Sequence, residues 1–480
     1  MTKRFGWNFP SAGRIRARLI VCLLALFTVI TPAYASDGIN GAGFGALWAV
    51  PFAGMLLSIA IVPMISHHFW EKWQGLVAAF WSLLLIIPLV TLLGWHKTGA
   101  ALFHTLALDY IPFILLLTAL FTTAGGIVIR GNLHGSPLMN CALLIIGALL
   151  ASVIGTTGAS MVMIRPVLRA NDNRQHNAHI VIFFIFLVSN IGGALTPLGD
   201  PPLFLGFLKG VGFFWTTAHL WLETLVASVI ILCLFFALDL YLYRKEGVTR
   251  DPTPDSALSF SGLINCVLIA CIIGAVLLSA SWHPGAAITM FDIEIAGQAL
   301  LRDTILIVVT FASLLLTPQR DREDNGFEWG PIKEVAILFI GIFATMIPVI
   351  AMLKAGASGP FAPLLSLVDG QDGAPNTMAY FWLTGGLSSF LDNAPTYLVF
   401  FELAGGDAAH LMTEGKPVLA AISAGAVFMG AMSYIGNAPN FMVYAMARRQ
   451  GVAMPGFFAY LLWSGAILLP TFGIVTALFF

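Results

Sequence analysis

The stretch Ser189-Asn190-Ile191-Gly192-Gly193-Ala194-Leu195-Thr196-Pro197-Leu198-Gly199-Asp200 interrupts a long apolar segment with glycines, a proline and polar side chains. A second stretch, Ser433-Tyr434-Ile435-Gly436-Asn437-Ala438, echoes its beginning about 244 positions later. Proline and paired glycines prevent a continuous helix, and a broken backbone at membrane depth is tolerated only where it lines a cavity or is buried in protein. One such break in each half of a chain points to a secondary transporter with internal repeats.

The composition is that of an integral membrane protein. Of 480 residues, 58% are hydrophobic and only 10% are charged, and the mean hydropathy is +0.89, whereas about 25% of residues in a soluble domain are charged. Several segments reach the roughly 20 apolar residues that one membrane crossing needs. The net charge of −1 says nothing of a polyanionic partner, and we expect no nucleic acid to bind. Neither a phosphate-binding G-x-x-x-x-G-K-[ST] loop nor a hydrolytic motif occurs, so the sequence predicts neither an enzyme nor a bound cofactor.

The first residues have the pattern of a secretory signal. Five basic residues precede the apolar run 19–30, and Ala33-Tyr34-Ala35 follows it. This predicts a cleaved signal peptide over 1–35, and the alternative is an uncleaved first helix. Either reading leaves Ser36 outside the cell.

Twelve segments are predicted to span the membrane or to re-enter it. Two of them, 138–168 and 375–404, are too long for one helix and are interrupted at 155–158 and 392–395, so we expect hairpins that return to the side they came from. With this layout 13 Lys and Arg residues lie inside and 5 outside, as the positive-inside rule requires of an inner-membrane protein. The segments are 44–66, 75–95, 109–129, 138–168, 178–207, 213–242, 259–281, 301–318, 333–353, 375–404, 418–446 and 456–479.

The order of these segments predicts an all-α polytopic membrane protein with inverted repeats. Each half contains a hairpin followed by a broken helix, and the two hairpins enter from opposite sides, so both tips and both breaks would meet at the midplane. We expect scaffold helices over 44–129, a first transport repeat over 138–207, further scaffold and connecting helices over 213–318, a second transport repeat over 333–446, and a final helix over 456–479.

The hairpin tip Leu391-Asp392-Asn393-Ala394-Pro395-Thr396 carries the first candidate carboxylate. A carboxylate at membrane depth costs about 2.5–3.5 kcal/mol, so its default interpretation is functional. Asp392 and the Asn393 amide oxygen are hard oxygen ligands that suit Na⁺. The alternative is that Asp392 caps a half-helix. Asp200 is the second candidate, with a turn-forming aspartate as its alternative.

Around these carboxylates lie hydroxyls, amides and freed carbonyls that complete the predicted ion site. For the first hairpin tip and the second break, close helix packing through small residues is the alternative. His176, His179 and Asp239 lie near segment ends, where we expect anchoring or solvated roles. The predicted ion-binding residues are Asp392, Asn393, Asp200, Asn190, Ser189, Thr196, Thr156, Thr157, Gly436 and Asn437, of which Asp392, Asn393, Asn190 and Asn437 are the candidate Na⁺ ligands.

These motifs resemble those of NhaD-type sodium/proton antiporters of the ion-transporter superfamily. The resemblance is specific in four windows, 189–200, 388–395, 430–437 and the helix around 333–342, and it extends as architecture from about residue 44 to the end. Related branches include citrate and dicarboxylate symporters, and this chain is similar to a subgroup described as citrate transporters. The resemblance implies a scaffold that forms a homodimer in the lipid bilayer, with a mobile transport domain.

One departure bears on function. NhaD-type proteins usually carry Asp-Asn at the first hairpin tip, where this chain has Gly155-Thr156. The first hypothesis is exchange of Na⁺, or Li⁺, for H⁺ at Asp392 with Asp200 assisting. The second is a Na⁺-coupled citrate or dicarboxylate symporter, although similar dicarboxylate carriers have neutral tips, and a carboxylate would repel an anionic substrate. The third is a membrane subunit that transports nothing.

Overall fold

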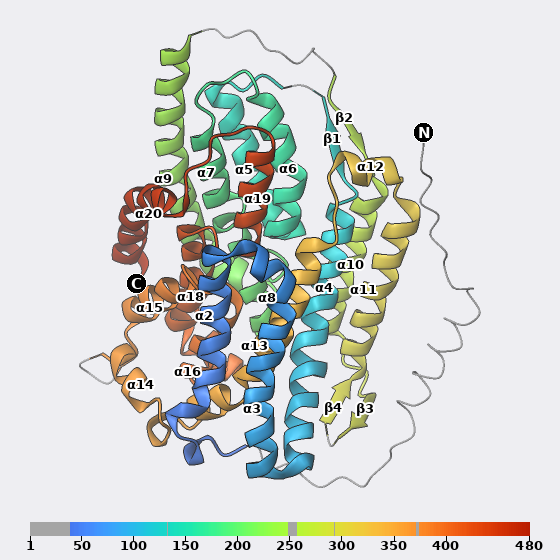
Figure 1. The fold of residues 1–480 in the computed structure, drawn as a ribbon, viewed down its shortest axis with the longest axis vertical. Coiled ribbons are helices and arrows are strands. Elements are labelled where there is room, and N and C mark those ends of the chain that lie inside the picture. Colours follow the sequence, from blue (N-terminus) through green and yellow to red (C-terminus); the bar gives the residue numbers. More distant parts are fainter. Residues whose placement is uncertain (1–38, 132, 248–256, 292, 371–373) are drawn as a thin grey trace.

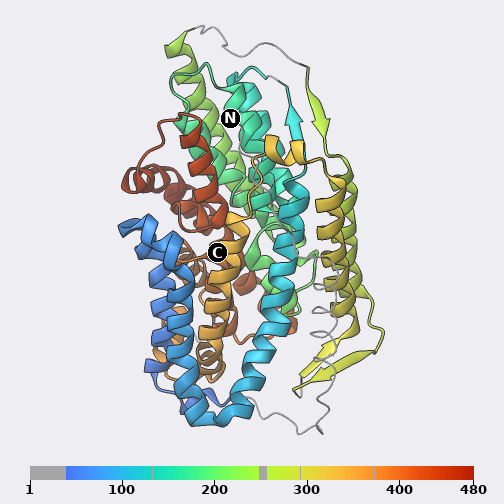
Figure 2. The same ribbon diagram turned by 45° about the vertical axis from the view of Figure 1, so that its right-hand side comes forward.

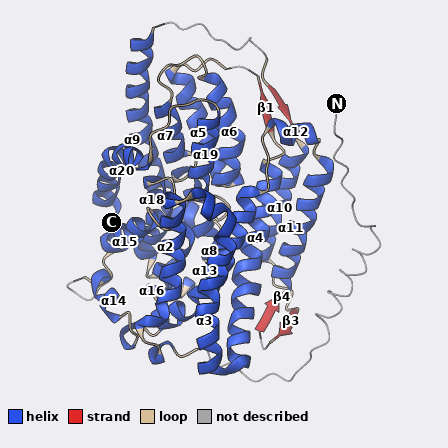
Figure 3. Ribbon diagram, in the orientation of Figure 1, coloured by secondary structure: helices blue, strands red, loops and turns tan. Residues whose placement is uncertain are grey.

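The computed structural model describes residues 39–480 except 132, 248–256, 292 and 371–373. The predicted signal peptide, 1–35, lies outside the described residues. Helices make up most of the described chain (Figure 3), and nine of those in the described ranges are long and apolar enough to cross a membrane. The molecule is therefore a multi-pass helical membrane protein, as its composition predicts.

We divide the helices into two bundles by their packing. In the first bundle, α2 and α3 pack on α13, and α10 and α11 pack on α4; these two sets lie on opposite flanks in Figure 2. The first bundle consists of α2 (Val50–Ile65), α3 (His67–His104), the π-helix η3 (Thr105–Tyr110), α4 (Ile111–Ala124), α10 (Ile264–Ser281), α11 (Gly297–Leu316), α12 (Gln319–Asp324) and α13 (Gly330–Lys354).

The second bundle contains both predicted hairpins and both predicted breaks. Its most enclosed segment is the span Ala178–Leu195, which is 89% buried. The second bundle consists of α5 (Pro137–Ile154), α6 (Thr156–Ala170), α7 (Ala178–Leu187), η4 (Ile191–Leu195), α8 (Pro201–Leu208), α9 (Trp215–Glu246), α15 (Thr377–Ser388), α16 (Asn393–Leu403), α18 (Lys416–Met429), η6 (Gly430–Met432), α19 (Ala438–Arg449) and α20 (Phe457–Phe479).

The hairpins turn where the sequence predicts breaks. Gly155 separates α5 from α6 with a φ of +80°, a conformation that favours glycine. The chain between Ser388 and Asn393 separates α15 from α16. Figure 1 shows α5 and α6 in the upper half of the molecule and α15 and α16 in the lower half. The helices α6, α8, α16 and α19 each begin at a hairpin tip or a break.

Three regions differ from the predicted layout. The helix α13 falls in the range predicted as the second transport repeat, yet it packs on α2 and α3 of the first bundle. The predicted spans 75–95 and 109–129 belong to one nearly continuous helical run. This run is interrupted at Gly94, whose backbone is not helical. The chain changes direction there, so that most of α3 descends and α4 ascends in Figure 1. The helix α9 falls in the range predicted as scaffold and connecting helices, yet it packs against η4, α5, α7, α18 and α20 of the second bundle.

Short strands and turns lie outside the bundles. The strand β1 (Val128–Arg130) pairs antiparallel with β2 (Ser259–Ser261), and β3 (Ala287–Met290) pairs antiparallel with β4 (Ile293–Ala296). No periodic signal predicted these three- and four-residue strands. The remaining elements are η1 (Gly41–Gly43), η2 (Ala46–Ala49), η5 (Gly356–Ser358), α14 (Ala362–Val368) and α17 (Ala408–Thr413).

Glycines allow the backbone of each break to close on itself. A Cβ atom on Gly199 would lie 2.1 Å from the carbonyl oxygen of Gly193, and one on Gly436 would lie 2.5 Å from that of Gly430. Both neighbours are backbone atoms and cannot rotate away. The two breaks thus depend on the same close backbone approach.

We expect Gly199→Ala to destabilise the protein by about 1–3 kcal/mol, the usual cost of overpacking, because its methyl group would collide with the Gly193 carbonyl. Gly274→Ala is the matched control, since nothing lies within 4 Å of a Cβ on Gly274. Thermal melting of the detergent-purified protein checks this. Equal melting temperatures for the two variants would contradict the close approach.

Candidate ion-binding site

The carboxylate of Asp200 is the centre to which both hairpins and the second break converge. Its side chain is buried, with an exposed fraction of 1%. The Thr156 hydroxyl donates to Oδ1 at 2.8 Å and the Asn437 amide donates to the same oxygen at 3.0 Å. The Asn393 amide donates to Oδ2. Three segments far apart in the sequence therefore hold one carboxylate.

The convergence follows from where the half-helices begin. Asp200 and Asn437 are the N-cap residues of α8 and α19, yet neither side chain caps its own helix. Thr156 and Asn393 are the first residues of α6 and α16. These side chains therefore meet one another, and four helix N-termini, each with a partial positive charge, surround the same point.

A chain of amides extends from this centre across the two breaks. The Asn437 amide also donates to the side-chain oxygen of Asn190 at 3.2 Å and to the carbonyl of Ser189 at 3.0 Å. Asn190 donates to Asn440 at 2.8 Å. Asn440 in turn donates to the carbonyls of Gly430 and Ser433, both at 2.8 Å. The second break is thereby fixed against the first.

The first hairpin and break make the same hydrogen bonds as the second hairpin and break, at a spacing of 237 positions along the chain. Thr196 donates to the Ser152 carbonyl, and Ser433 donates to the Ser389 carbonyl. The Ser152 hydroxyl donates to the backbone carbonyl of Gly192, and the Ser389 hydroxyl donates to the backbone carbonyl of Met429. In this register Asp200 is equivalent to Asn437, Thr156 to Asn393, and Gly155 to Asp392.

The spacing of about 244 suggested by the sequence is therefore wrong. That spacing aligned Ser189 with Ser433 because in both stretches a single residue separates the serine from an Ile-Gly pair. The hydrogen bonds instead make Thr196 the counterpart of Ser433. Leu198-Gly199, rather than Ile191-Gly192, is thus the counterpart of Ile435-Gly436.

Asp392, the first candidate from sequence, lies at the edge of this centre and has a capping role. It is half-buried, and its carboxylate accepts a hydrogen bond from the backbone N–H of Ala394 at 3.0 Å, which caps α16. Its carbonyl accepts from Thr396 at 2.9 Å. Asp392 therefore caps a half-helix, as the alternative prediction expected, and in the described chain it makes no hydrogen bond to Asp200.

The other predicted residues divide into those near Asp200 and those that support the backbone. Ser189 is buried and its hydroxyl lies 2.9 Å from that of Ser160. Thr196 ties the first break to α5. Gly436 contributes backbone at the second break. Thr157 is half-exposed and makes no side-chain hydrogen bond within the described chain.

Three residues of this region were missing from the predicted site: Ser160, Asn440 and Gly193. A Cβ on Gly193 would lie 2.5 Å from Thr156 and 3.2 Å from Cβ of Asp200, so this glycine leaves the space beside the carboxylate open. The glycine pair at 192–193 signalled a break, but only the fold shows which glycine faces Asp200.

The charge of the site is uncompensated by any cationic side chain. Within the described residues, neither Asp200 nor Asp392 has an ion pair with Lys, Arg or His. The side-chain oxygen of Asn393 is buried and lacks a hydrogen-bond partner. A buried charge without a partner is costly, so an added cation or proton is the species this arrangement accommodates.

A second buried polar cluster lies away from this site and corrects the roles expected for His179 and Asp239. Asp239 is fully buried, and its Oδ1 lies 2.8 Å from Nη2 of Arg174 and 2.9 Å from Nε2 of His179. Asn140 donates to its other oxygen at 2.9 Å. The cluster joins α5, α7 and α9 internally, so neither residue is a solvated anchor. His176 is exposed, as expected.

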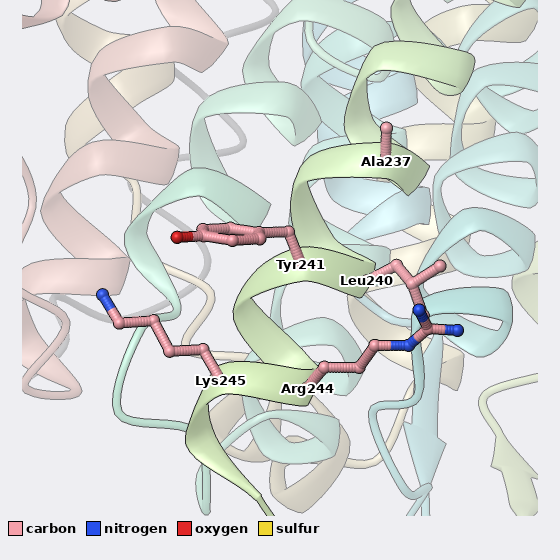
Figure 4. Close-up of a pocket in the computed structure, with 5 residues that line it drawn as sticks. All are labelled: Ala237, Leu240, Tyr241, Arg244 and Lys245. Atoms are coloured by element: carbon pink, nitrogen blue, oxygen red, sulfur yellow. The ribbon is translucent and has the colours of Figure 1, made fainter.

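A shallow groove on the end of α9 shares no residue with the site. Figure 4 shows Tyr241, Arg244 and Lys245 along this helix, with Ala237 and Leu240 completing the lining. The side chains of Arg244 and Lys245 extend away from the helix axis.

Comparison with known proteins gives a family and distant relatives. An uncharacterized transporter of Mycobacterium tuberculosis is 25% identical over 386 residues, covering 76% of this chain and 84% of the relative. A 46 kDa membrane protein of Mycobacterium leprae is 24% identical over 380 residues, covering 74% and 81%. The profile of a family described as "Putative citrate transport" matches residues 41–480. The chain belongs to this transporter family.

Proposed function

We propose that the protein is a secondary carrier that exchanges Na⁺ for H⁺ at Asp200, with Li⁺ as a possible substitute ion. The single observation that carries the proposal is a dry carboxylate with three hydrogen-bond donors and no cationic side chain. Its charge is costly at membrane depth. A bound Na⁺ or a proton removes that cost, and since both neutralise the same group, only one can be bound at a time.

The ligands proposed for Na⁺ differ in emphasis from those expected from sequence. Asp200 takes the place of Asp392 as the exchanging carboxylate, because Asp200 is fully buried where the hairpins meet, whereas Asp392 is half-buried and caps α16. The side-chain oxygen of Asn393, which has no hydrogen-bond partner, supplies a further hard ligand. The side-chain oxygen of Asn190, which accepts from Asn437, and that of Asn437 would supply others. Binding Na⁺ requires the Asn393 and Asn437 amide groups to turn, since at present they donate to Asp200.

The two bundles suit the alternating access that such exchange requires. We propose that the second bundle, with α9 included, is the transport domain and that the first bundle is the scaffold, which forms a homodimer in the inner membrane. The hairpins in opposite halves of the molecule (Figure 1) and the equivalent contacts at 237 positions support inverted repeats. The second bundle would carry the site past α4 and α13, which it contacts through α6, α8, α16 and α19.

Na⁺-coupled uptake of citrate or a dicarboxylate is the second candidate. Four helix N-termini face the same point, which favours an anion, and the family description names citrate. In that case Asp200 would bind Na⁺ together with the substrate and release both inside, and while Na⁺ is bound the neutralised carboxylate would not repel the substrate.

Everted membrane vesicles with a pH-gradient dye distinguish the two candidates. We expect addition of NaCl alone to dissipate an imposed pH gradient, because exchange needs no organic substrate. Vesicles from cells without the protein are the control. A response that requires citrate would make the symporter the better assignment, and no response to either would contradict both.

We expect Asp200→Asn to reduce Na⁺-dependent exchange to the background of control vesicles, because the amide keeps the shape of the side chain but neither binds nor releases a proton. Asp407→Asn is the matched control, since Asp407 caps the short helix α17 outside the site and asparagine caps equally well. Both variants should elute as folded protein in size-exclusion chromatography. Exchange in Asp200→Asn at the wild-type rate would refute the assignment.

Two substitutions separate the charge of Asp392 from its capping role. Asparagine preserves the cap, whereas alanine loses about 1 kcal/mol of helix stability. We expect Asp392→Asn to raise the half-saturating Na⁺ concentration by about tenfold, equivalent to roughly 1.4 kcal/mol, and Asp392→Ala to lower the melting temperature as well. Wild-type kinetics in Asp392→Asn would show that capping is its whole contribution.

A further inference from the structure

Two of the half-helices that begin at the site end in ion pairs with the first bundle. The helix α8 begins after Asp200 and is followed by Lys209, whose Nζ lies 2.8 Å from Oδ1 of Asp109 on η3. The helix α16 begins at Asn393 and carries Glu402 in its last turn, with Oε2 3.8 Å from Nζ of Lys354 at the end of α13. Each ion pair therefore joins the second bundle to the first.

The two ion pairs form one charged junction between the bundles, and they are oriented in opposite directions. The second bundle supplies the base of one pair and the acid of the other. Asp109 and Lys209 also lie within electrostatic range of Glu402, as does Lys354. Glu402 and Asp109 are almost wholly buried, with side-chain exposed fractions of 2% and 8%, so removal of the lysine from either pair leaves a carboxylate that water cannot easily solvate.

The junction is rigidly connected to the ion site. With a rise of 1.5 Å per residue, the eight residues of α8 span about 12 Å and the eleven of α16 about 16 Å. Neither helix contains an internal proline beyond its first turn. A displacement of Asp200 or Asn393 therefore moves Lys209 or Glu402.

The contacts of α6, a third half-helix that begins at the site, are of a different kind. Arg165 and Arg169 on α6 donate to the backbone carbonyls of Asp324 and Ile129. In the described chain these are hydrogen bonds to carbonyls, whereas α8 and α16 end in pairs of full charges. Asp109 also lies in a π-helix, a distortion frequently found at functional sites.

We infer that Lys209 and Glu402 are positioning residues that couple the occupancy of the ion site to contact between the bundles through the Lys209–Asp109 and Glu402–Lys354 pairs. The inference rests on the proposed function, because it presumes that the bundles move during transport. Coupling of this kind is reciprocal. Breaking the pairs changes ion exchange, and fixing them holds the second bundle in one position.

A cysteine pair tests whether the junction must open. In a variant whose five native cysteines are replaced by serine, we expect a reducible bis-maleimide that links Asp109→Cys to Lys209→Cys to stop Na⁺-dependent exchange, and a reductant to restore the rate of the unlinked double variant. Trp70→Cys/Glu334→Cys is the matched control, because the same linker joins α3 to α13 within the first bundle and should leave exchange intact. Full exchange with the 109–209 pair cross-linked would overturn the inference.

Charge reversal tests whether the pair acts electrostatically. We expect Lys209→Asp or Asp109→Lys alone to lower the maximal exchange rate by about tenfold, and the double exchange Lys209→Asp/Asp109→Lys to restore it to within about threefold. Melting temperatures separate coupling from loss of fold. A folded double variant that remains as slow as the single variants would overturn the inference.

A measurement independent of transport covers the case in which the protein does not exchange Na⁺ at all. Thr157 at the first hairpin tip is half-exposed, so Thr157→Cys in the cysteine-free background can be labelled with a maleimide. We expect Lys209→Asp to change the labelling rate at least threefold and the double exchange to restore it. No Na⁺ response with this pattern would refute only the proposed exchange, whereas unchanged labelling would refute the coupling.

Discussion

The structure depends on the placement of one carboxylate out of reach of water. Asp200 is held by a hydroxyl and two amides from three other segments, and this set of donors can form only if both hairpin tips and the second break reach the same point. The glycines at 193, 199, 430 and 436 serve this requirement by allowing the backbone to approach within distances that a side chain would forbid. The hairpin turns and the helix breaks thus meet the needs of a single buried carboxylate.

Much of the fold is predictable from the sequence because the bilayer restricts the possible structures so strongly. Lipid requires long apolar helices, so every predicted segment has a helical counterpart, and Gly155 and Asp392 mark the turns of the hairpins. Packing partners could not be predicted in the same way. The apolar residues of α9 are spread around the whole helix rather than on one face, so its sequence does not indicate whether it packs with the hairpins or with the neighbouring helices α10 and α11.

The sequence predicts which residues belong to the site, but it does not predict which carboxylate lies at its centre. Residue type and position singled out Asp200, Asn190, Asn393 and Asn437, which the fold brings together. Sequence alone ranked Asp392 first, because a carboxylate beside a proline signals a break, but only the geometry shows that its oxygen is used for capping. Asn440 and Ser160 carry no signal of their own, since a single Asn or Ser in an apolar helix is equally consistent with packing. Similarly, His179 and Asp239 resemble interfacial residues until their mutual contact is seen.

The equivalence of Asp200 with Asn437 has an electrical consequence. The two side chains are nearly identical in shape, so the site is close to symmetric in form. Only the Asp200 side chain, however, can carry a negative charge. A cation bound between the two side chains would therefore be drawn toward Asp200 rather than lie midway between them. If the bundles alternate as proposed, the inward-facing and outward-facing arrangements would consequently differ in energy, and the empty carrier would favour one side of the membrane.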